Sequence, residues 1–168
     1  MKRKSLCLLL GVALVLGGLA ACKKGPEKPP AGTTPIDDLV KAGKSPITVG
    51  NLVRGISPVA PTFSVTVVNV SDAPVKLING SVVFFDDNGK ALADTIQESG
   101  YTDLEPIPAG GQIQLSMIAA DEKAVSGKWI VKEVVYEKPN PVDKRYGNLS
   151  YKWTNPNFEA ELAAEKNK

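Results

Sequence analysis

Three segments of this chain alternate apolar and polar residues with a period of two. Phe63, Val65 and Val67 alternate with hydroxyl-bearing residues, and the same alternation recurs in 112–117 and 148–153. Successive side chains of a β-strand point to opposite faces, so each segment is expected to form a strand with one face in a core. A chain that repeats this pattern at short intervals is expected to stack β-sheets rather than helices.

Four further segments favour strands by composition. They are 47–53, 75–85, 90–96 and 129–136, the last of which is rich in β-branched and aromatic residues. The polar segment 97–111 is the longest expected connection and has room for a small helical turn. Strands and helices do not alternate, so we expect an all-β fold, an antiparallel sandwich of about seven strands.

Helices are expected only outside this sandwich. Residues 36–44 predict one or two helical turns, with acidic residues in the first turn and Gly43 at the end. Residues 156–166 predict a short C-terminal helix, because Asn155 can cap it and Pro156 suits its first position. The apolar face of this helix is narrow, which leaves open whether it docks on the sandwich.

The start of the chain has the three parts of an export signal. A basic start at residues 2–4 precedes an almost unbroken apolar run, 6–19, and the small residues Ala20 and Ala21 precede Cys22. The run is shorter than the roughly 20 residues that a transmembrane helix needs. We therefore interpret residues 1–21 as a removable signal.

The sequence Leu-Ala-Ala-Cys at 19–22 resembles the lipobox of bacterial lipoproteins. This resemblance implies cleavage between Ala21 and Cys22, a thioether-linked diacylglycerol on Cys22, and acylation of the new amino terminus. The mature chain would then be anchored in a bilayer of the bacterial cell envelope. Residue 23 is Lys rather than the Asp that resembles an inner-membrane retention signal, so the outer membrane is favoured in a cell with two membranes. The alternative is an ordinary secretory signal with an incidental cysteine.

The chain is expected to divide into four parts. The signal, 1–21, is followed by 22–46, which holds the lipidated cysteine, a Pro-rich linker and the short helix. The sandwich occupies 47–154 and the C-terminal helix and tail occupy 155–168. Four prolines and two glycines in 23–35 preclude a packed core there and favour a disordered, extended tether.

Missing residue types exclude several functions. The chain has no histidine, which excludes Ser-His-Asp and Cys-His catalysis and histidine-ligated zinc or haem. Of two cysteines only Cys22 outlasts signal removal, so no internal disulfide is possible. Three of the 20 Lys and Arg lie in the signal, which leaves 17 against 18 Asp and Glu and no basic stripe for nucleic acid. We expect no enzyme, no catalytic residues, and no cofactor beyond the covalent lipid.

One polar turn is a candidate metal site. Asp86, Asp87 and Asn88 are clustered oxygen donors, whereas Ca²⁺ takes six to eight oxygens and the loop lacks the ligand spacing of an EF-hand. These residues and Gly89 lie between two apolar runs, where Asn and Gly accept a positive φ. A tight hairpin is therefore the preferred interpretation, with calcium as the alternative.

Aromatic residues are candidates for partner binding. Tyr and Trp are favoured at interfaces because they combine a large area with a polar group. Trp129 and Trp153 follow the strand alternation and are expected in the core. Tyr101 and Tyr146 lie in expected connections and are the better surface candidates.

Several motifs resemble those of FxLYD-type domains. Residues 69–75 resemble the strand-end turn of that family, 82–92 its aromatic-Asp-x-x-Gly-Lys-x-Leu hairpin, and 104–110 a lengthened Leu-x-Pro-Gly element. The resemblance covers 47–137. It implies an immunoglobulin-like β-sandwich, often on a secreted or lipidated bacterial protein, and implies no activity. The chain departs from the family after Tyr136, where a Pro-rich loop, a strand and a helix extend the domain.

The expected function is that of a membrane-anchored envelope lipoprotein. It would be a non-enzymatic interaction or structural accessory module that presents loops or an edge strand to an envelope protein. The alternative is a sandwich that binds a small ligand or calcium at the Asp86, Asp87 and Asn88 end. A hydrolase built on Asp86 and Asp121 is disfavoured, because no spacing brings the two carboxylates together.

Overall fold

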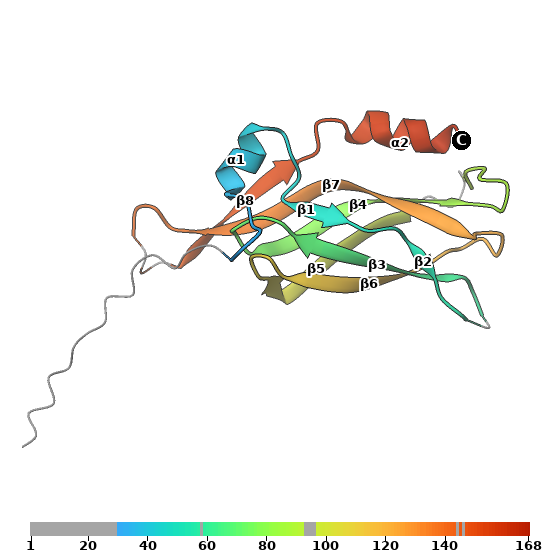
Figure 1. The fold of residues 1–168 in the computed structure, drawn as a ribbon, viewed down its shortest axis with the longest axis horizontal. Helices are drawn as coiled ribbons and strands as arrows, with labels where there is room; N and C mark the ends of the chain where they lie inside the picture. The colour runs from blue at the N-terminus through green and yellow to red at the C-terminus, as the bar shows by residue number, and fades with distance from the viewer. Residues whose placement is uncertain (1–29, 58, 93–96, 144, 146) are drawn as a thin grey trace, which may run out of the picture.

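Two antiparallel four-stranded sheets pack face to face (Figure 1). The structure is a computed structural model that describes residues 30–57, 59–92, 97–143, 145 and 147–168. The expected fold class, an immunoglobulin-like antiparallel β-sandwich with a C-terminal helix, is confirmed in these residues. The predicted signal and most of the predicted tether lie outside them. No helix in the described part of the chain is long and apolar enough to cross a membrane.

The first sheet is built around β3 (Thr62–Asn69). On one side β3 pairs with β6 (Gln112–Ile118), and on the other with β1 (Ile47–Val49) and β2 (Val53–Arg54). The expectation of one strand over 47–53 is therefore wrong. The register explains the break, because β1 ends opposite Val67 and β2 begins opposite Ser64. Three residues, 50–52, connect β1 to β2, whereas only two residues, 65 and 66, lie between the matching positions of β3.

The second sheet has the order β5–β4–β7–β8. Its strands are β4 (Val75–Phe85), β5 (Gln97–Ile107), β7 (Ser126–Pro139) and β8 (Asn148–Thr154). The expected connection over 97–111 is wrong, because most of it is β5. An edge strand needs backbone pairing on one side only, which lets β5 carry proline and glycine without the apolar alternation of a central strand.

A strand expected over 90–96 is reduced to a single bridge in its described part. Ala91 bridges to Phe85, and the N–H of Leu92 donates to the carbonyl of Phe84 at 2.8 Å. The tight turn that starts at Asp86 brings only these residues back alongside β4. Residues 93–96 lie outside the described residues.

The main core lies between the two sheets. Phe63 of β3 and Phe84 of β4 meet there with ring centroids 5.0 Å apart. The predicted core positions of Trp129 and Trp153 are confirmed, since the two residues are 4% and 5% exposed. Each contributes a large apolar area from the second sheet to this single cluster.

A second, smaller core lies on the outer face of the second sheet. There α2 (Phe158–Lys166) packs Phe158 and Leu162 against apolar side chains of β4 and β7, including Val83 and Ile130. The helix begins two residues later than expected. Asn155 accepts a hydrogen bond from the N–H of Asn157 at 2.9 Å, so it shapes the turn before the helix instead of capping it.

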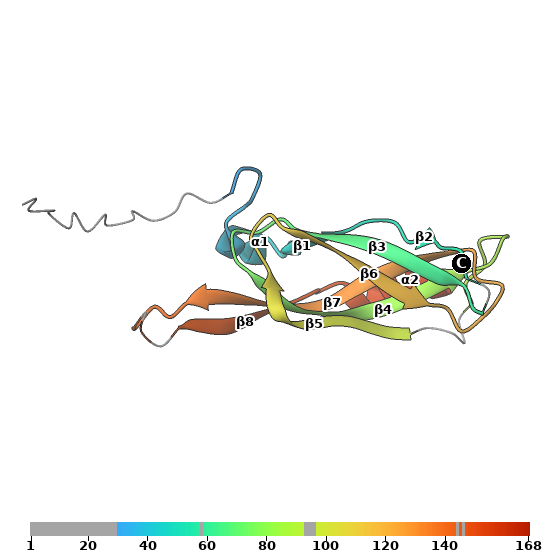
Figure 2. The same cartoon turned by 90° about the horizontal axis from the view of Figure 1, so that it is seen from below.

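The other helix, α1 (Ile36–Lys41), lies where the described chain begins. It buries Ile36 and Leu39 and is followed by Gly43 at φ +66°, as predicted for its end. Just before α1, the N–H of Thr34 donates to the carbonyl of Val70 at 2.8 Å. The β7–β8 hairpin projects past the sandwich at this same end (Figure 2), which we call the α1 end.

Candidate functional site

The Asp86 turn forms the predicted hairpin. The Asp86 carboxylate accepts hydrogen bonds from the N–H groups of Asn88 and Lys90, both at 2.9 Å, and Gly89 takes φ +77°. Asp87 accepts from the Asn88 side-chain amide at 2.9 Å. One carboxylate oxygen of Asp86 and one of Asp87, both proposed as calcium ligands, thus already accept hydrogen bonds within the turn. Among the described residues, no three or more acidic, Cys or His side chains are grouped to hold a metal ion.

The Asp86 turn lines one open hollow on the described surface, and a larger hollow lies elsewhere. That turn and the Glu122 loop line a hollow of about 410 Å³. A hollow of about 630 Å³ lies between α2 and the outer face of β4, β5 and β7. On its floor, the hydrogen bond from the Asn79 amide to Glu133, 2.9 Å long, lowers the pKa of Glu133, and Lys152 adds to this effect while burial opposes it. The carboxylate there already has polar partners.

Of the two tyrosines proposed as surface contacts, the structure describes only one. Tyr101 lies within β5, where its half-buried ring packs against the main core and its hydroxyl donates to the Glu105 carbonyl at 2.9 Å. The prediction that Tyr101 lies in a connection is therefore wrong, whereas its role as a partner contact stays a prediction. Tyr146 lies outside the described residues.

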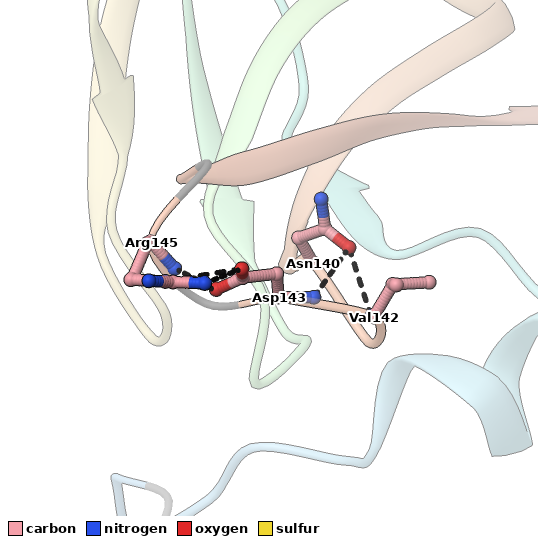
Figure 3. A network of polar contacts seen from close by, with 4 residues as sticks. All are labelled: Asn140, Val142, Asp143 and Arg145. Carbon is pink, nitrogen blue, oxygen red and sulfur yellow. Dashed lines mark hydrogen bonds and ion pairs between the residues drawn. The ribbon is translucent and has the colours of Figure 1, made fainter.

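The β7–β8 hairpin extends beyond the rest of the sandwich at the α1 end (Figure 2). Tyr136 of β7 still lies opposite Val75, the first residue of β4, whereas Lys138 and Pro139 pair only with β8. At the tip, the Asn140 side-chain oxygen accepts from the N–H of Val142 at 2.9 Å and of Asp143 at 3.3 Å (Figure 3). The Pro-rich loop expected directly after Tyr136 begins later than predicted, because Lys138 and Pro139 continue the strand.

The tip carries an ion pair and an exposed apolar residue. The Arg145 guanidinium donates to Asp143, with the shortest contact at 2.7 Å, and this contact lowers the pKa of Asp143 (Figure 3). Val142 is 92% exposed. A hydrogen-bonded turn thus holds an apolar side chain out into solvent.

An aromatic and ionic contact fixes the base of the hairpin to α1. The rings of Tyr136 and Tyr151 stack with centroids 5.9 Å apart, and the Lys138 ammonium lies 5.6 Å from the Tyr151 ring. Lys138 also donates to both carboxylate oxygens of Asp37, at 2.7 and 2.8 Å. The Asp37 hydrogen bond raises the pKa of Lys138, and burial raises the pKa of Tyr136.

The outer edge of β8 has no strand partner within the described residues. On either side of β8, the backbone N–H of Asn140 donates to the Gly147 carbonyl and the N–H of Asn155 donates to the Lys132 carbonyl. The backbone groups of odd-numbered residues in this strand are therefore directed toward β7. Backbone direction alternates along an antiparallel strand. The N–H and C=O groups of Asn148, Ser150 and Lys152 therefore point outward, and these three residues are exposed.

The opposite edge, β5, carries the features that discourage edge pairing. It contains Pro106, Gly100 and the acidic residues Glu98 and Glu105, and its register against β4 shifts between Val75 and Leu77. Proline, charge and bulges are the usual means by which edge strands avoid new partners. The chain of β8 has no proline or glycine and a continuous register with β7. Of these two edges, β8 is the more open to a partner.

Fold and surface together define an immunoglobulin-like sandwich with an open edge strand. No protein-family model matches this chain, and no curated protein matches it. A solved structure of a DUF1425 family member from Shewanella sp. is similar, with 14% sequence identity and a TM-score of 0.40 over 51% of this chain and 76% of that one. A likeness this distant has no bearing on function.

Proposed function

We propose that the protein is a lipid-anchored, non-enzymatic interaction module of the bacterial envelope. Cys22 would hold it in the bilayer, and β8 would bind an extended segment of an envelope protein. The outward N–H and C=O groups of Asn148, Ser150 and Lys152 support this function more than any other observation. An added strand would pair with them as a fifth member of the second sheet.

The side chains around this edge suit such a partner. Leu149 and Tyr151 lie on the inner side of β8 and are 41% and 36% exposed, so a bound strand would cover apolar area in addition to the backbone groups. Lys152 lies on the other side and pairs with Glu133 at 3.4 Å. Backbone pairing would supply the affinity, and contacts with these alternating side chains would supply selectivity.

The anchoring part of the proposal rests on the sequence. The lipobox-like residues 19–22 and the Pro-rich 23–35 precede a folded unit whose described chain starts at the α1 end. We further propose that the sandwich is of the FxLYD type. Two of the motifs that carry that resemblance form turns, the Asp86 hairpin and the hydrogen-bonded turn after Asn69.

The experiment is affinity capture from detergent-solubilised native envelopes with the lipidated full chain and two variants. Ser150→Pro removes one outward N–H and leaves the bonds from β8 to β7 in place, whereas Ser150→Ala keeps that N–H. We expect the wild type and Ser150→Ala to recover the same protein and Ser150→Pro to lose it. Thermal unfolding of the three chains checks that the proline variant is folded.

Two outcomes contradict different parts of this proposal. Equal recovery by Ser150→Pro and Ser150→Ala would show that β8 is not the docking edge. Intact-mass analysis of the native protein, beside a Cys22→Ala variant, tests the anchor separately. A mass for residues 22–168 without acyl chains would rule out lipid anchoring.

A further inference from the structure

The end of the sandwich that receives the tether is the end from which the β7–β8 hairpin projects. Pro30, the first described residue, and Thr33 lie beside Gly110 in the turn between β5 and β6. Thr34 then bridges to Ser71, in the turn before β4. Both turns belong to the α1 end, and the two views agree that the hairpin extends beyond it (Figures 1 and 2).

The lengths involved allow the hairpin tip to reach the membrane. Cys22 precedes Pro30 by eight residues, which span at most about 25 Å in an extended polyproline-type conformation. Beyond Tyr136, the last β7 residue opposite β4, the strand continues for three residues to Pro139, a projection of about 10 Å before the turn that carries Val142. A tip that extends this far toward an anchor on so short a tether can contact the bilayer surface.

The chemistry of the tip suits a membrane interface. Val142 is 92% exposed, and Leu149, on the same hairpin, is 41% exposed. The sequence over 138–149 contains three Lys and Arg residues and one Asp, a net positive charge, although Lys138 pairs with Asp37 and Arg145 with Asp143. Apolar side chains beside a net positive charge favour the headgroup region of an anionic membrane.

We propose that the tip of the β7–β8 hairpin is a second membrane contact, which binds the surface of an anionic bilayer. The lipid supplies the anchor and the tip fixes the orientation of the domain. With the α1 end against the membrane, the opposite end, which holds the connection between β2 and β3, faces away from it (Figure 1). Ile56, in that connection, is fully exposed. This inference rests on the proposed lipid anchor at Cys22.

Fluorescence from a single thiol label tests this orientation. In the mature lipidated chain Cys22 is modified and Cys7 has left with the signal, so Val142→Cys gives one labelling position. The matched control is Ile56→Cys, an exposed apolar residue at the opposite end. Each chain carries an environment-sensitive dye and is reconstituted into vesicles of phosphatidylethanolamine with or without phosphatidylglycerol, some containing nitroxide-labelled lipid.

We expect the label at position 142 to shift its emission to the blue and to be quenched several-fold more strongly than the label at 56, with more quenching in the anionic vesicles. The vesicles contain no other protein, so quenching by the lipid nitroxide identifies the bilayer as the partner. Equal quenching at the two positions would overturn the tip contact while leaving the anchor intact. A chain whose intact mass shows no acyl group would overturn the anchor and this inference together.

Discussion

Lys138 of β7 donates to both carboxylate oxygens of Asp37 in α1, across 101 residues of sequence. The pair ties the projecting hairpin to the helix that follows the tether. Asp37 is 60% exposed and Lys138 31% exposed, so the pair is well solvated and its effect on global stability is expected to be small. We expect the pair to restrain the hairpin rather than to stabilise the whole fold.

Replacing Asp37 with Asn is therefore expected to loosen the hairpin more than it destabilises the fold. The free energy of unfolding should fall by less than about 1 kcal/mol, while amide exchange in the hairpin rises. Urea unfolding and hydrogen exchange measure the two effects. Asp38→Asn, the same change one residue along α1, is the control and should leave exchange in the hairpin unchanged. Equal exchange in both variants would contradict a role for the ion pair.

A buried asparagine stabilises the turns at the α1 end. Asn69 is fully buried, and its amide donates to the carbonyls of Ala73, Ile107 and Pro108 at 2.8 to 3.1 Å. Its side-chain oxygen accepts from the N–H and the hydroxyl of Ser71. One side chain thus joins the end of β3 to two other segments.

Asn69→Ala is expected to destabilise the protein by about 2–4 kcal/mol, because it leaves several buried polar groups without partners. Urea unfolding gives the value. Asn140→Ala, at the exposed hairpin tip, removes hydrogen bonds from a solvated turn and should cost less than about 1 kcal/mol. A loss of the same size in both variants would mean that burial of the Asn69 network contributes nothing.

Sequence reasoning located the strands that have one buried face. β3 follows a strict alternation of apolar and polar residues, which a half-buried strand requires, and the Asp86 turn has residues that accept its backbone conformation. β5 was missed because an edge strand is held by backbone bonds, which leave no apolar pattern in a segment with Pro106 and Gly100. The sequence does not decide whether α2 docks, because two apolar residues do not reveal the surface they meet.

The sequence predicts that an edge strand can bind a partner, but it does not predict which strand lies at the edge. The sequence indicated that some edge strand exists, but strand order is set by pairing between distant segments. That β8 ends the sheet, with Ser150 directed outward, follows from its register with β7. The contact between Asp37 and Lys138 likewise depends on how α1 sits against the hairpin, which no local pattern in either segment contains.

The docking of α2 is expected to weaken in acid. The Glu165 carboxylate is largely buried and forms ion pairs with the ammonium groups of Lys128 at 2.6 Å and Lys168 at 2.5 Å. The Lys128 hydrogen bond, followed by that of Lys168, lowers the pKa of Glu165. The ionised form is therefore favoured in the folded chain. Its contribution to stability is present above the pKa of an unfolded Glu, about 4.3, and is lost as the pH falls through the lowered folded value.

Glu165→Gln should accordingly destabilise the protein near pH 6, and its difference from the wild type should shrink as the pH falls below about 4.3 and the wild type loses the charge. Urea unfolding across this range measures the gap between the two chains. Glu159→Gln, at an exposed position of the same helix, is the control and should show a much smaller gap. A gap for Glu165→Gln that does not change with pH would contradict the ionic contribution.

Phe158 is expected to supply most of the apolar contact that holds α2 on the sheet. It is 7% exposed and packs with Val83 and Ile130, and the Lys132 ammonium lies 5.6 Å from its ring. Phe158→Ala should cost about 2–4 kcal/mol and raise amide exchange in α2. The tryptophan fluorescence of the folded state should stay unchanged, because Trp129 and Trp153 belong to the separate core between the sheets. Leu149→Ala, at an exposed apolar position, is the control; if it destabilises as much as Phe158→Ala, the second core does not hold the helix.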